Sequence, residues 1–310
     1  AYLTSNRKDG HGEEDIYRVF FKQPITAHQQ ISEVPTFYQM QLLALNNNVK
    51  PTEPIAEPVE IKEYYISHLF FDANVDILTP QNNKKLDQLA NLLLIYPKIT
   101  AELSCFELPT GQKTFNLYFS IKKTEKAAEY LAGKGIPRSR LLLKGYGSSF
   151  PLVAKPVSNN ISPLYQKLNQ RLEIALHDYE SEPVIIDIEG IKVPENLQDP
   201  KGVKFSTLSN QLFYSVQIAS ISQILQNQAI ESVEELFIEV ENSSGNYLDM
   251  AGMMPTFKEA EKLMSSLIDL GFPDARIVPY INGIRIPQGS VADYAKKYPD
   301  LLFFLAGKKK

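Results

Sequence analysis

The sequence predicts a mixed α/β protein built from two folded stretches. Residues 65–174 and 213–280 each alternate strand-like runs with amphipathic helices that are bounded by turn residues. A third observation is the proline-punctuated, polar composition of residues 23–62, which is typical of a tether and not of a packed core. We therefore expect an α/β (α+β) chain in which two units are joined by extended linkers.

The first stretch has the predicted order βαβαββ. It opens with a strand over 65–72, and the helix after it is marked by Thr79 as a capping residue and Pro80 in the first turn. Further strands are expected over 99–105, 141–143 and 170–174. The helix between the first two of these strands has one sheet-facing stripe, because steps of three and four separate its members. They are Leu117, Ile121, Thr124, Ala128 and Leu131.

Short motifs match one family along the whole of this stretch. They are Phe70-Phe71-Asp72, Asn116 with Ser120, Tyr130-Leu131, Gly135-Ile136-Pro137-Arg138, Gly145-Tyr146-Gly147 and Asn169-Gln170-Arg171-Leu172-Glu173. With these motifs, residues 63–178 resemble the OmpA-like, peptidoglycan-associated domain family. The resemblance implies a domain that holds the peptide stem of peptidoglycan between an Asp in the turn after the second strand and an Arg on the next helix.

The chain departs from that family at both of these positions. Alignment on Gly111 and Asn116 puts Leu108 in place of the Asp and Lys123 in place of the Arg. Leu108 cannot pair with an ammonium group, and Lys123 lacks the two parallel hydrogen bonds of a guanidinium. A shift of one residue in the turn would instead supply Glu107 as a substitute acid. The candidate residues for binding peptidoglycan or a partner are Glu107, Leu108, Asn116, Lys123 and Arg171.

The second stretch has the predicted order βαββαβ. Strands are expected over 213–219, 235–241, 247–250 and 275–280, with a polar helix over 222–229. A capping box, Thr256 with Glu259, starts the second helix, which ends at Gly271.

A family resemblance also covers this stretch, on looser motifs. They are Tyr214-x-Val216-Gln217, Tyr247 with Gly252, Thr256-x-x-Glu259-Ala260 and Gly271-Phe272. With these motifs, residues 211–288 resemble the SPOR-like domain family, which implies binding of glycan strands that lack peptide stems. The glycan candidates are Tyr214, Gln217 and Tyr247, through tyrosine stacking and glutamine hydrogen bonds. Packing of both tyrosines in the core is the alternative.

The remaining segments predict a hairpin, two linkers and a tail. Residues 1–22 pair two short strands around a glycine-containing turn and resemble a blade of periplasmic β-propellers. Residues 23–62 form the proline-rich linker, in which Val34 to Leu45 is a candidate docking helix. Residues 179–210 are a second linker, and 289–310 are a C-terminal tail. The chain starts without Met or a signal peptide, so we expect that it is part of a longer protein.

The composition argues against several functional classes. The chain has 32 basic and 36 acidic residues and a formal charge of -4, which argues against a nucleic-acid or anionic-membrane surface. The single cysteine, Cys105, excludes an internal disulfide, and no apolar run is long enough to span a bilayer. The histidines have no metal-ligand spacing, and no phosphate loop or nucleophile elbow is present. We expect no enzyme activity, no cofactor and no metal.

Two functional hypotheses remain. The first is a non-catalytic scaffold in the periplasm, associated with the outer membrane, that binds other envelope proteins. The combination of resemblances is similar to envelope proteins of the Bacteroidetes lineage, some of which belong to type IX secretion and gliding machinery. The second is a working peptidoglycan anchor. An anchor should have an open cleft beside Gly111, whereas a scaffold should bury Phe106 and Leu108 against a partner.

Overall fold

A computed structural model of the protein describes residues 2–5, 15–18, 61–72, 76–156, 162–223 and 228–307. The chain divides into two compact units, Ala1–Val59 and Glu60–Lys310. In the first unit, β1 (Tyr2–Ser5) and β2 (Asp15–Arg18) pair antiparallel, as the predicted hairpin requires. The candidate helix at Val34 to Leu45 lies outside the described residues.

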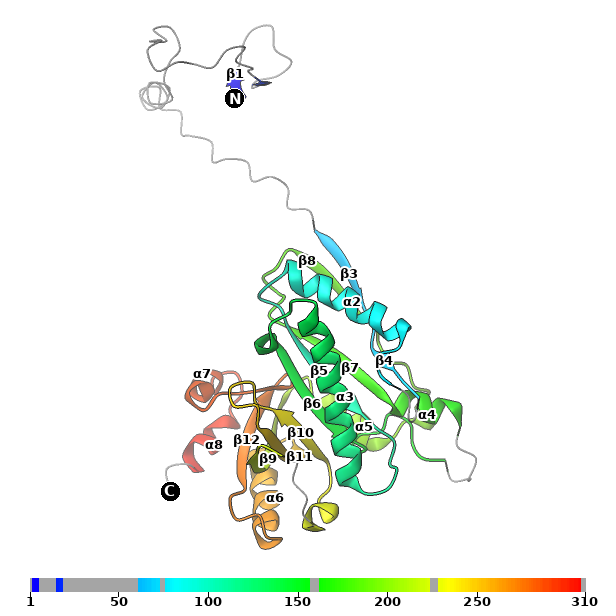
Figure 1. Ribbon diagram of the computed structural model, residues 1–310. Helices are drawn as coiled ribbons and strands as arrows, with labels where there is room; N and C mark the ends of the chain where they lie inside the picture. Colours follow the sequence, from blue (N-terminus) through cyan, green and yellow to red (C-terminus); the bar gives the residue numbers. More distant parts are fainter. Residues whose placement is uncertain are drawn as a thin grey trace. The chain divides into compact units, whose positions relative to one another are not determined.

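One nine-stranded sheet runs through the second unit (Figure 1), in the order β13-β12-β9-β11-β10-β6-β5-β7-β4. The first stretch supplies β4 (Leu69–Phe70), β5 (Thr100–Phe106), β6 (Leu141–Gly147) and β7 (Arg171–His177). The second stretch supplies β9 (Leu212–Ile221), β10 (Leu236–Val240), β11 (Tyr247–Met254), β12 (Arg276–Ile281) and β13 (Ile284–Arg285).

The two stretches join where β10 lies antiparallel to β6. Ile238 is opposite Gly145, and Glu239 is opposite Lys144. This pairing satisfies backbone groups that would otherwise form an open edge of the first sheet. The expected α/β class is confirmed, and the two expected units share one continuous sheet.

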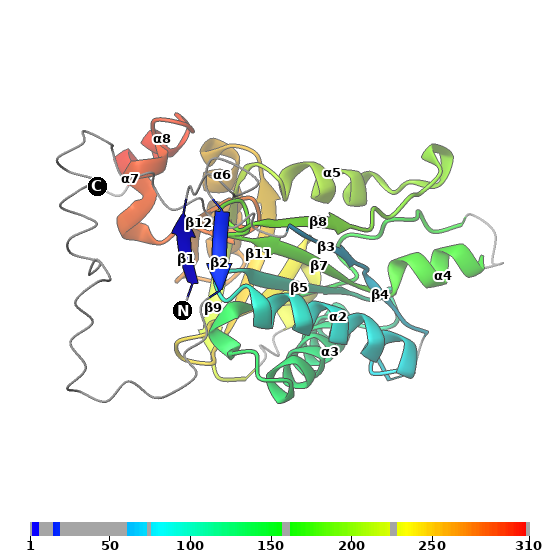
Figure 2. The ribbon, with the colours of Figure 1, turned by 90° about the horizontal axis from the view of Figure 1, so that it is seen from above.

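Two helices of the first stretch cover one face of this sheet (Figure 2): α2 (Pro80–Ile95) and α3 (Lys113–Gly133). Thr79 caps α2 as predicted, since its side chain accepts a hydrogen bond from the Asn82 amide. The apolar stripe of α3 is buried along its whole length. Gly145 of β6 allows this close packing, because a Cβ there would lie 2.7 Å from the backbone nitrogen of Ile121.

The structure differs from the sequence prediction in three segments of the first stretch and the linker after it. The expected strand over 65–72 is divided into β3 (Lys62–Ile66) and β4. The expected loop before β7 contains α4 (Pro163–Asn169), and a short 3-10 helix, η1 (Arg138–Arg140), precedes β6. The expected linker over 179–210 contains β8 (Val184–Ile188), η2 (Glu195–Leu197) and α5 (Pro200–Leu208).

These segments are held in place by contacts with residues that are far from them in sequence. β8 pairs in parallel with β3 and forms a separate two-stranded sheet. Asp199 caps α5, and Phe205 and Leu208 of that helix are buried. They join an aromatic cluster that includes Phe106 and Tyr146. An extended linker is therefore not what the structure shows at 179–210.

The second stretch follows the expected strand order around α6 (Phe257–Asp269), which Thr256 caps. Where a helix over 222–229 was expected, the described residues contain η3 (Gln228–Ser232). The tail forms η4 (Gln288–Ser290), α7 (Val291–Tyr294) and α8 (Leu301–Gly307). Leu301 and Phe304 pack with Tyr214 in a core cluster of their own. None of the described helices is long and apolar enough to span a bilayer.

Candidate functional site

The structure brings Glu107 and Lys123 together as an ion pair at the turn after β5. The Lys123 Nζ atom lies 2.5 Å from Glu107 Oε1, and the two side chains are 19% and 8% exposed. Burial raises the pKa of Glu107, and the neighbouring Lys123 and Gln170 oppose that rise. The Lys123 ammonium group also lies 4.1 Å from the centroid of the Phe71 ring. The substitute acid considered from the sequence is thus the residue that pairs with Lys123.

Leu108, the residue after Glu107, belongs to a small apolar cluster. It packs with Val153, Tyr165 and Leu168, and the last two belong to α4. Because α4 was not expected from the sequence, this cover was missed. Leu108 is therefore part of the core and is not free to contact a separate partner.

Asn116 holds the turn that precedes α3. Its Oδ1 atom accepts a hydrogen bond from the Thr110 hydroxyl at 3.2 Å, and its Nδ2 atom donates to Ser148 Oγ at 3.3 Å. The side chain is buried. These contacts fix the position of the turn, so Asn116 has a structural role here.

Arg171 is completely buried at the start of β7. Its Nε atom donates to Glu173 Oε1 at 2.6 Å, and its guanidinium carbon lies 3.8 Å from the centroid of the Phe106 ring. Burial lowers the pKa of Arg171, and Glu173 opposes that change. Arg171 is thus a buried structural residue of the sheet, and its side chain does not reach the surface near Glu107.

The three glycan candidates all contact other parts of the chain. Tyr214 is fully buried, with its ring 5.9 Å from that of Phe257. Gln217 is buried too, and its Oε1 atom accepts hydrogen bonds from Arg276 at 3.1 Å and Arg285 at 2.7 Å. Tyr214 therefore packs in the core, which was the alternative considered for the tyrosines. Gln217 has a structural role, because two arginines donate hydrogen bonds to its side chain.

Tyr247 connects the two stretches of the sheet. Its hydroxyl accepts a hydrogen bond from Lys122 Nζ at 2.7 Å and donates to Glu125 Oε1 at 2.8 Å, and both partners lie on α3. The Lys122 ammonium group is also 5.1 Å from the centroid of the Tyr247 ring. This tyrosine is half-buried, and its hydroxyl group is hydrogen-bonded within the chain.

A buried charge cluster that the sequence analysis missed lies at the join between β6 and β10. Lys144 Nζ lies 2.9 Å from Glu102 Oε2 and 3.7 Å from Glu239 Oε1, and it donates to the Gly283 carbonyl at 2.5 Å. Burial would raise the pKa of Glu102, but Lys144 and His177 outweigh it and hold that pKa at about 2. The sequence signal for this cluster was one charged residue within each of three otherwise apolar strands.

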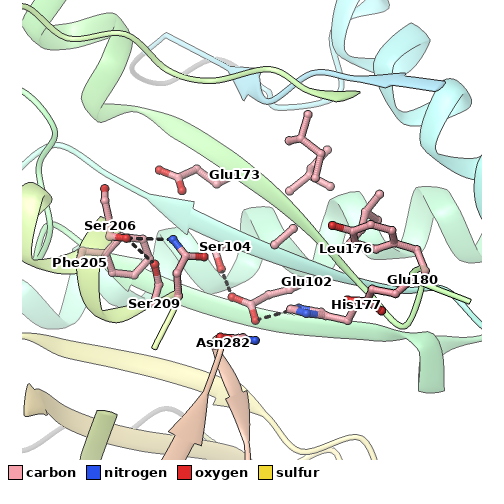
Figure 3. Close-up of a pocket in the computed structure, with 16 residues that line it drawn as sticks. Glu102, Ser104, Glu173, Leu176, His177, Glu180, Phe205, Ser206, Ser209 and Asn282 are labelled. Atoms are coloured by element: carbon pink, nitrogen blue, oxygen red, sulfur yellow. Dashed lines mark hydrogen bonds and ion pairs between the residues drawn. The ribbon is translucent and has the colours of Figure 1, made fainter. Parts of the chain in front are cut away.

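A pocket of about 560 Å³ lies beside this cluster (Figure 3). Glu102, Ser104 and His177 line it from the sheet, and α5 and the turn at Asn282 line it from the other side. Ser104 donates to Glu102 at 2.9 Å, and His177 Nε2 lies 3.7 Å from the other oxygen of the same carboxylate.

The order of these three groups differs from that of a hydrolytic triad. In such a triad the imidazole stands between the hydroxyl and the acid and removes the hydroxyl proton. Here the carboxylate stands between Ser104 and His177, so the hydroxyl donates to Glu102 and not to the imidazole. Among the described residues there is also no group of three or more His, Cys, Asp or Glu side chains arranged to hold a metal.

Comparison with known proteins gives partial relatives. No protein-family model matches the chain. Outer membrane protein A of Yersinia pseudotuberculosis is 31% identical over 140 residues, which are 43% of this chain and 39% of the relative. Outer membrane porin F of Pseudomonas fluorescens is 23% identical over 123 residues, 40% of this chain and 35% of the relative. The chain thus spans less than half the length of these relatives.

Solved structures show weaker similarity. The peptidoglycan-associated lipoprotein of Burkholderia pseudomallei aligns with a TM-score of 0.31 and 19% identity, covering 35% of this chain and 88% of that one. The periplasmic domain of Helicobacter pylori MotB aligns with a TM-score of 0.29 and 17% identity, covering 35% and 69%. The curated relatives support the OmpA-like resemblance of part of the chain. The SPOR-like, propeller and Bacteroidetes resemblances stay predictions.

Proposed function

We propose that this protein is a non-catalytic scaffold of the bacterial cell envelope, located in the periplasm and associated with the outer membrane. The similarity to outer membrane protein A supports an envelope location. The observation that carries the scaffold role is the 2.5 Å pair between Glu107 and Lys123. The resemblance to OmpA-like domains implies an acid in this turn and an Arg on the next helix that hold a ligand. Here Glu107, one residue before the position of that acid, pairs instead with Lys123, which stands in place of the Arg.

The residues around this pair strengthen the proposal. Leu108 and Arg171 are buried in the core, so neither adds a ligand contact beside Glu107. A zwitterionic peptide group would have to separate Glu107 from Lys123 and replace both halves of a largely buried ion pair. Binding would therefore carry the energetic cost of separating this ion pair, a cost that is absent from a site without such a pair.

A partner of such a scaffold would bind at a different surface from the one that the sequence analysis predicted. Phe106 was expected to contact a partner, but it is covered by Phe205 of α5, with ring centroids 5.2 Å apart. Leu108 is covered by α4. The chain itself supplies the cover that was expected from another protein, so a partner must use a different surface.

A peptidoglycan anchor is the second candidate, and one observation favours it. A Cβ placed on Gly111 would meet no heavy atom within 4 Å, so the space beside this turn is open. Glu107 lies just before this turn, after the end of β5, and Lys123 lies on α3, the helix that follows the turn. Roles in type IX secretion or gliding are finer hypotheses that rest on the sequence resemblances alone.

Co-sedimentation of the whole chain with purified peptidoglycan sacculi tests the proposal. We expect the chain to stay in the supernatant, and the variants Glu107→Gln and Lys123→Met to behave in the same way. Lys258→Met, on the exposed surface of α6, is the matched control for loss of one positive charge. Pelleting of the unmodified chain that Glu107→Gln or Lys123→Met abolishes, and Lys258→Met does not, would establish the anchor instead.

A further inference from the structure

Among the residues that the structure describes, the two-stranded sheet of β3 and β8 has packing partners on one face only. Its strands are parallel, with Glu63 opposite Ile185 and Tyr65 opposite Asp187. The alternate side chains, Tyr64 and Ile186 among them, pack against the main core. The Tyr64 ring also makes an edge contact with Tyr96, the C-terminal cap of α2, at 6.0 Å between centroids. The inner face is therefore held by α2 and the core.

The outer face presents apolar and acidic side chains in alternation. Tyr65 is 50% exposed and Ile185 is 52% exposed, and Ile61, just before β3, is 59% exposed. Glu63 and Asp187 alternate with them on the same face, and both are exposed. Within the part of the chain that the structure describes, neither carboxylate forms an ion pair.

Parallel strands exposed in this way are uncommon. Parallel sheets occur almost only with both faces covered, usually by helices, and a pair of strands alone is marginally stable. Five residues of strand extend roughly 17 Å, which matches about eleven residues of helix, and one helix is about as wide as two strands. The outer face thus has the dimensions that a single helix of three turns covers.

We propose that the outer face of β3 and β8 is a docking surface for a basic amphipathic helix of another envelope protein. The apolar side of that helix covers Tyr65 and Ile185. Lysine or arginine side chains at its margins pair with Glu63 and Asp187, which form no ion pair with any described residue. Charge complementarity selects this occupant over an acidic or neutral helix.

A recess at the end of the face extends this surface. It has a volume of about 540 Å³ and shares Tyr65 and Asp187 with the face. Phe70 and Glu189 also line it, and Lys167 and Lys192 add positive charge there. A long apolar side chain at the end of the docked helix fits into this recess, against the rings of Tyr65 and Phe70.

This proposal rests on the proposed scaffold role, because it names the chemistry of the partner. The two are tested by different measurements. If the chain pellets with sacculi, the scaffold role fails and the docking surface remains open to test. If the chain ignores sacculi and the basic helix does not bind, only the docking surface fails.

The test uses the whole chain and a fluorescent helical peptide. The peptide carries leucine at positions i, i+3, i+4 and i+7 and lysine elsewhere, and a matched peptide carries glutamate in place of lysine. Fluorescence anisotropy should show binding of the basic peptide that weakens as salt is added. Tyr65→Ser with Ile185→Thr, and separately Glu63→Lys with Asp187→Lys, should each weaken that binding by about tenfold or more.

A second pair of charge reversals controls for the net charge of the chain. Glu261→Lys with Asp269→Lys, exposed on α6, gives the same change of charge and should bind the basic peptide as the unmodified chain does. Equal binding of the acidic peptide, or equal loss in this control, would overturn the proposal. So would self-association in sedimentation velocity that Ile185→Lys abolishes, because the face would then belong to a second copy of the chain.

Discussion

Lys144 and Glu239 are cross-strand partners at the point where β6 meets β10, and their charged groups lie 3.7 Å apart. This pair places a buried ammonium group between carboxylates from both stretches of the chain, since Glu102 is 2.9 Å from the same nitrogen atom. The Tyr280 hydroxyl donates to Glu239 at 2.8 Å, and Arg285 Nε lies 3.6 Å from the same oxygen atom. The join between the stretches therefore depends on a polar network inside an otherwise apolar sheet.

Replacement of Lys144 should destabilise the whole second unit. Lys144→Met keeps the length of the side chain but leaves Glu102 without its lysine partner and Glu239 with Arg285 alone, at 3.6 Å. Removal of one partner of a buried ion pair typically costs about 3–5 kcal/mol. Urea denaturation followed by circular dichroism would measure the loss. Lys258→Met on the surface should change the stability by less than about 0.5 kcal/mol. A loss that small for Lys144→Met would show that water reaches the cluster.

The same cluster predicts a loss of stability in acid. The pKa of Glu102 falls from 4.5 to about 2 in the folded state, because Lys144 and His177 outweigh burial. A lowered acid pKa contributes stability that is full above about pH 4.5 and is lost as the pH falls toward 2, a contribution of about 3 kcal/mol.

Glu102→Gln isolates this contribution. The variant should be less stable than the unmodified chain at neutral pH, and the difference should shrink as the pH falls toward 2. Denaturation curves at several pH values provide the measurement. If the difference stays constant over this range, Glu102 has an ordinary pKa and the ion pair is not the source of the acid sensitivity.

The sequence predicted the local features of the fold well. The α3 stripe from Leu117 to Leu131 is buried as its spacing indicated, and Thr79 and Thr256 cap the helices they were assigned to. These signals are local, because spacing and capping act within one or two helical turns.

The join of the sheet and the cover of the candidate site could not be predicted in the same way. β10 meets β6 across roughly ninety residues of chain, and nothing in either strand specifies its neighbour. Phe205 lies in a segment with linker composition, and its burial depends on Phe106 and Tyr146, which are far away in sequence. Glu107 was considered as the acid, but its contact with Lys123 depends on the shape of a turn.

Truncation of Phe205 should detach α5 from the sheet. Its ring contacts those of Phe106, Tyr146 and Phe150, with centroids 4.9 to 5.2 Å apart. Phe205→Ala should therefore cost about 3–5 kcal/mol. Val203→Ala on the exposed side of the same helix is the control and should cost far less. Hydrogen exchange should be faster at the α5 amides in Phe205→Ala, and unchanged exchange would mean that the Asp199 cap and Leu208 hold α5 without the Phe205 ring.

Asp249 on β11 should make the protein less stable as the pH rises. The carboxyl group is almost completely buried, and its Oδ2 atom has no hydrogen-bond partner. Burial raises the pKa of Asp249 from 3.8 to about 7. A raised acid pKa costs nothing below about pH 3.8, costs progressively more up to pH 7, and costs about 4 kcal/mol above it.

Asp249→Asn removes the charge at nearly constant volume and should therefore stabilise the protein above pH 7, with an effect that fades as the pH falls toward 4. Urea denaturation of both proteins at the two ends of this range provides the measurement. Glu241→Gln, on the partly exposed segment after β10, is the control for the general loss of one negative charge. An Asp249→Asn variant that is equally stabilised or destabilised at both ends would show that the pKa of the carboxyl group is not raised in the folded protein.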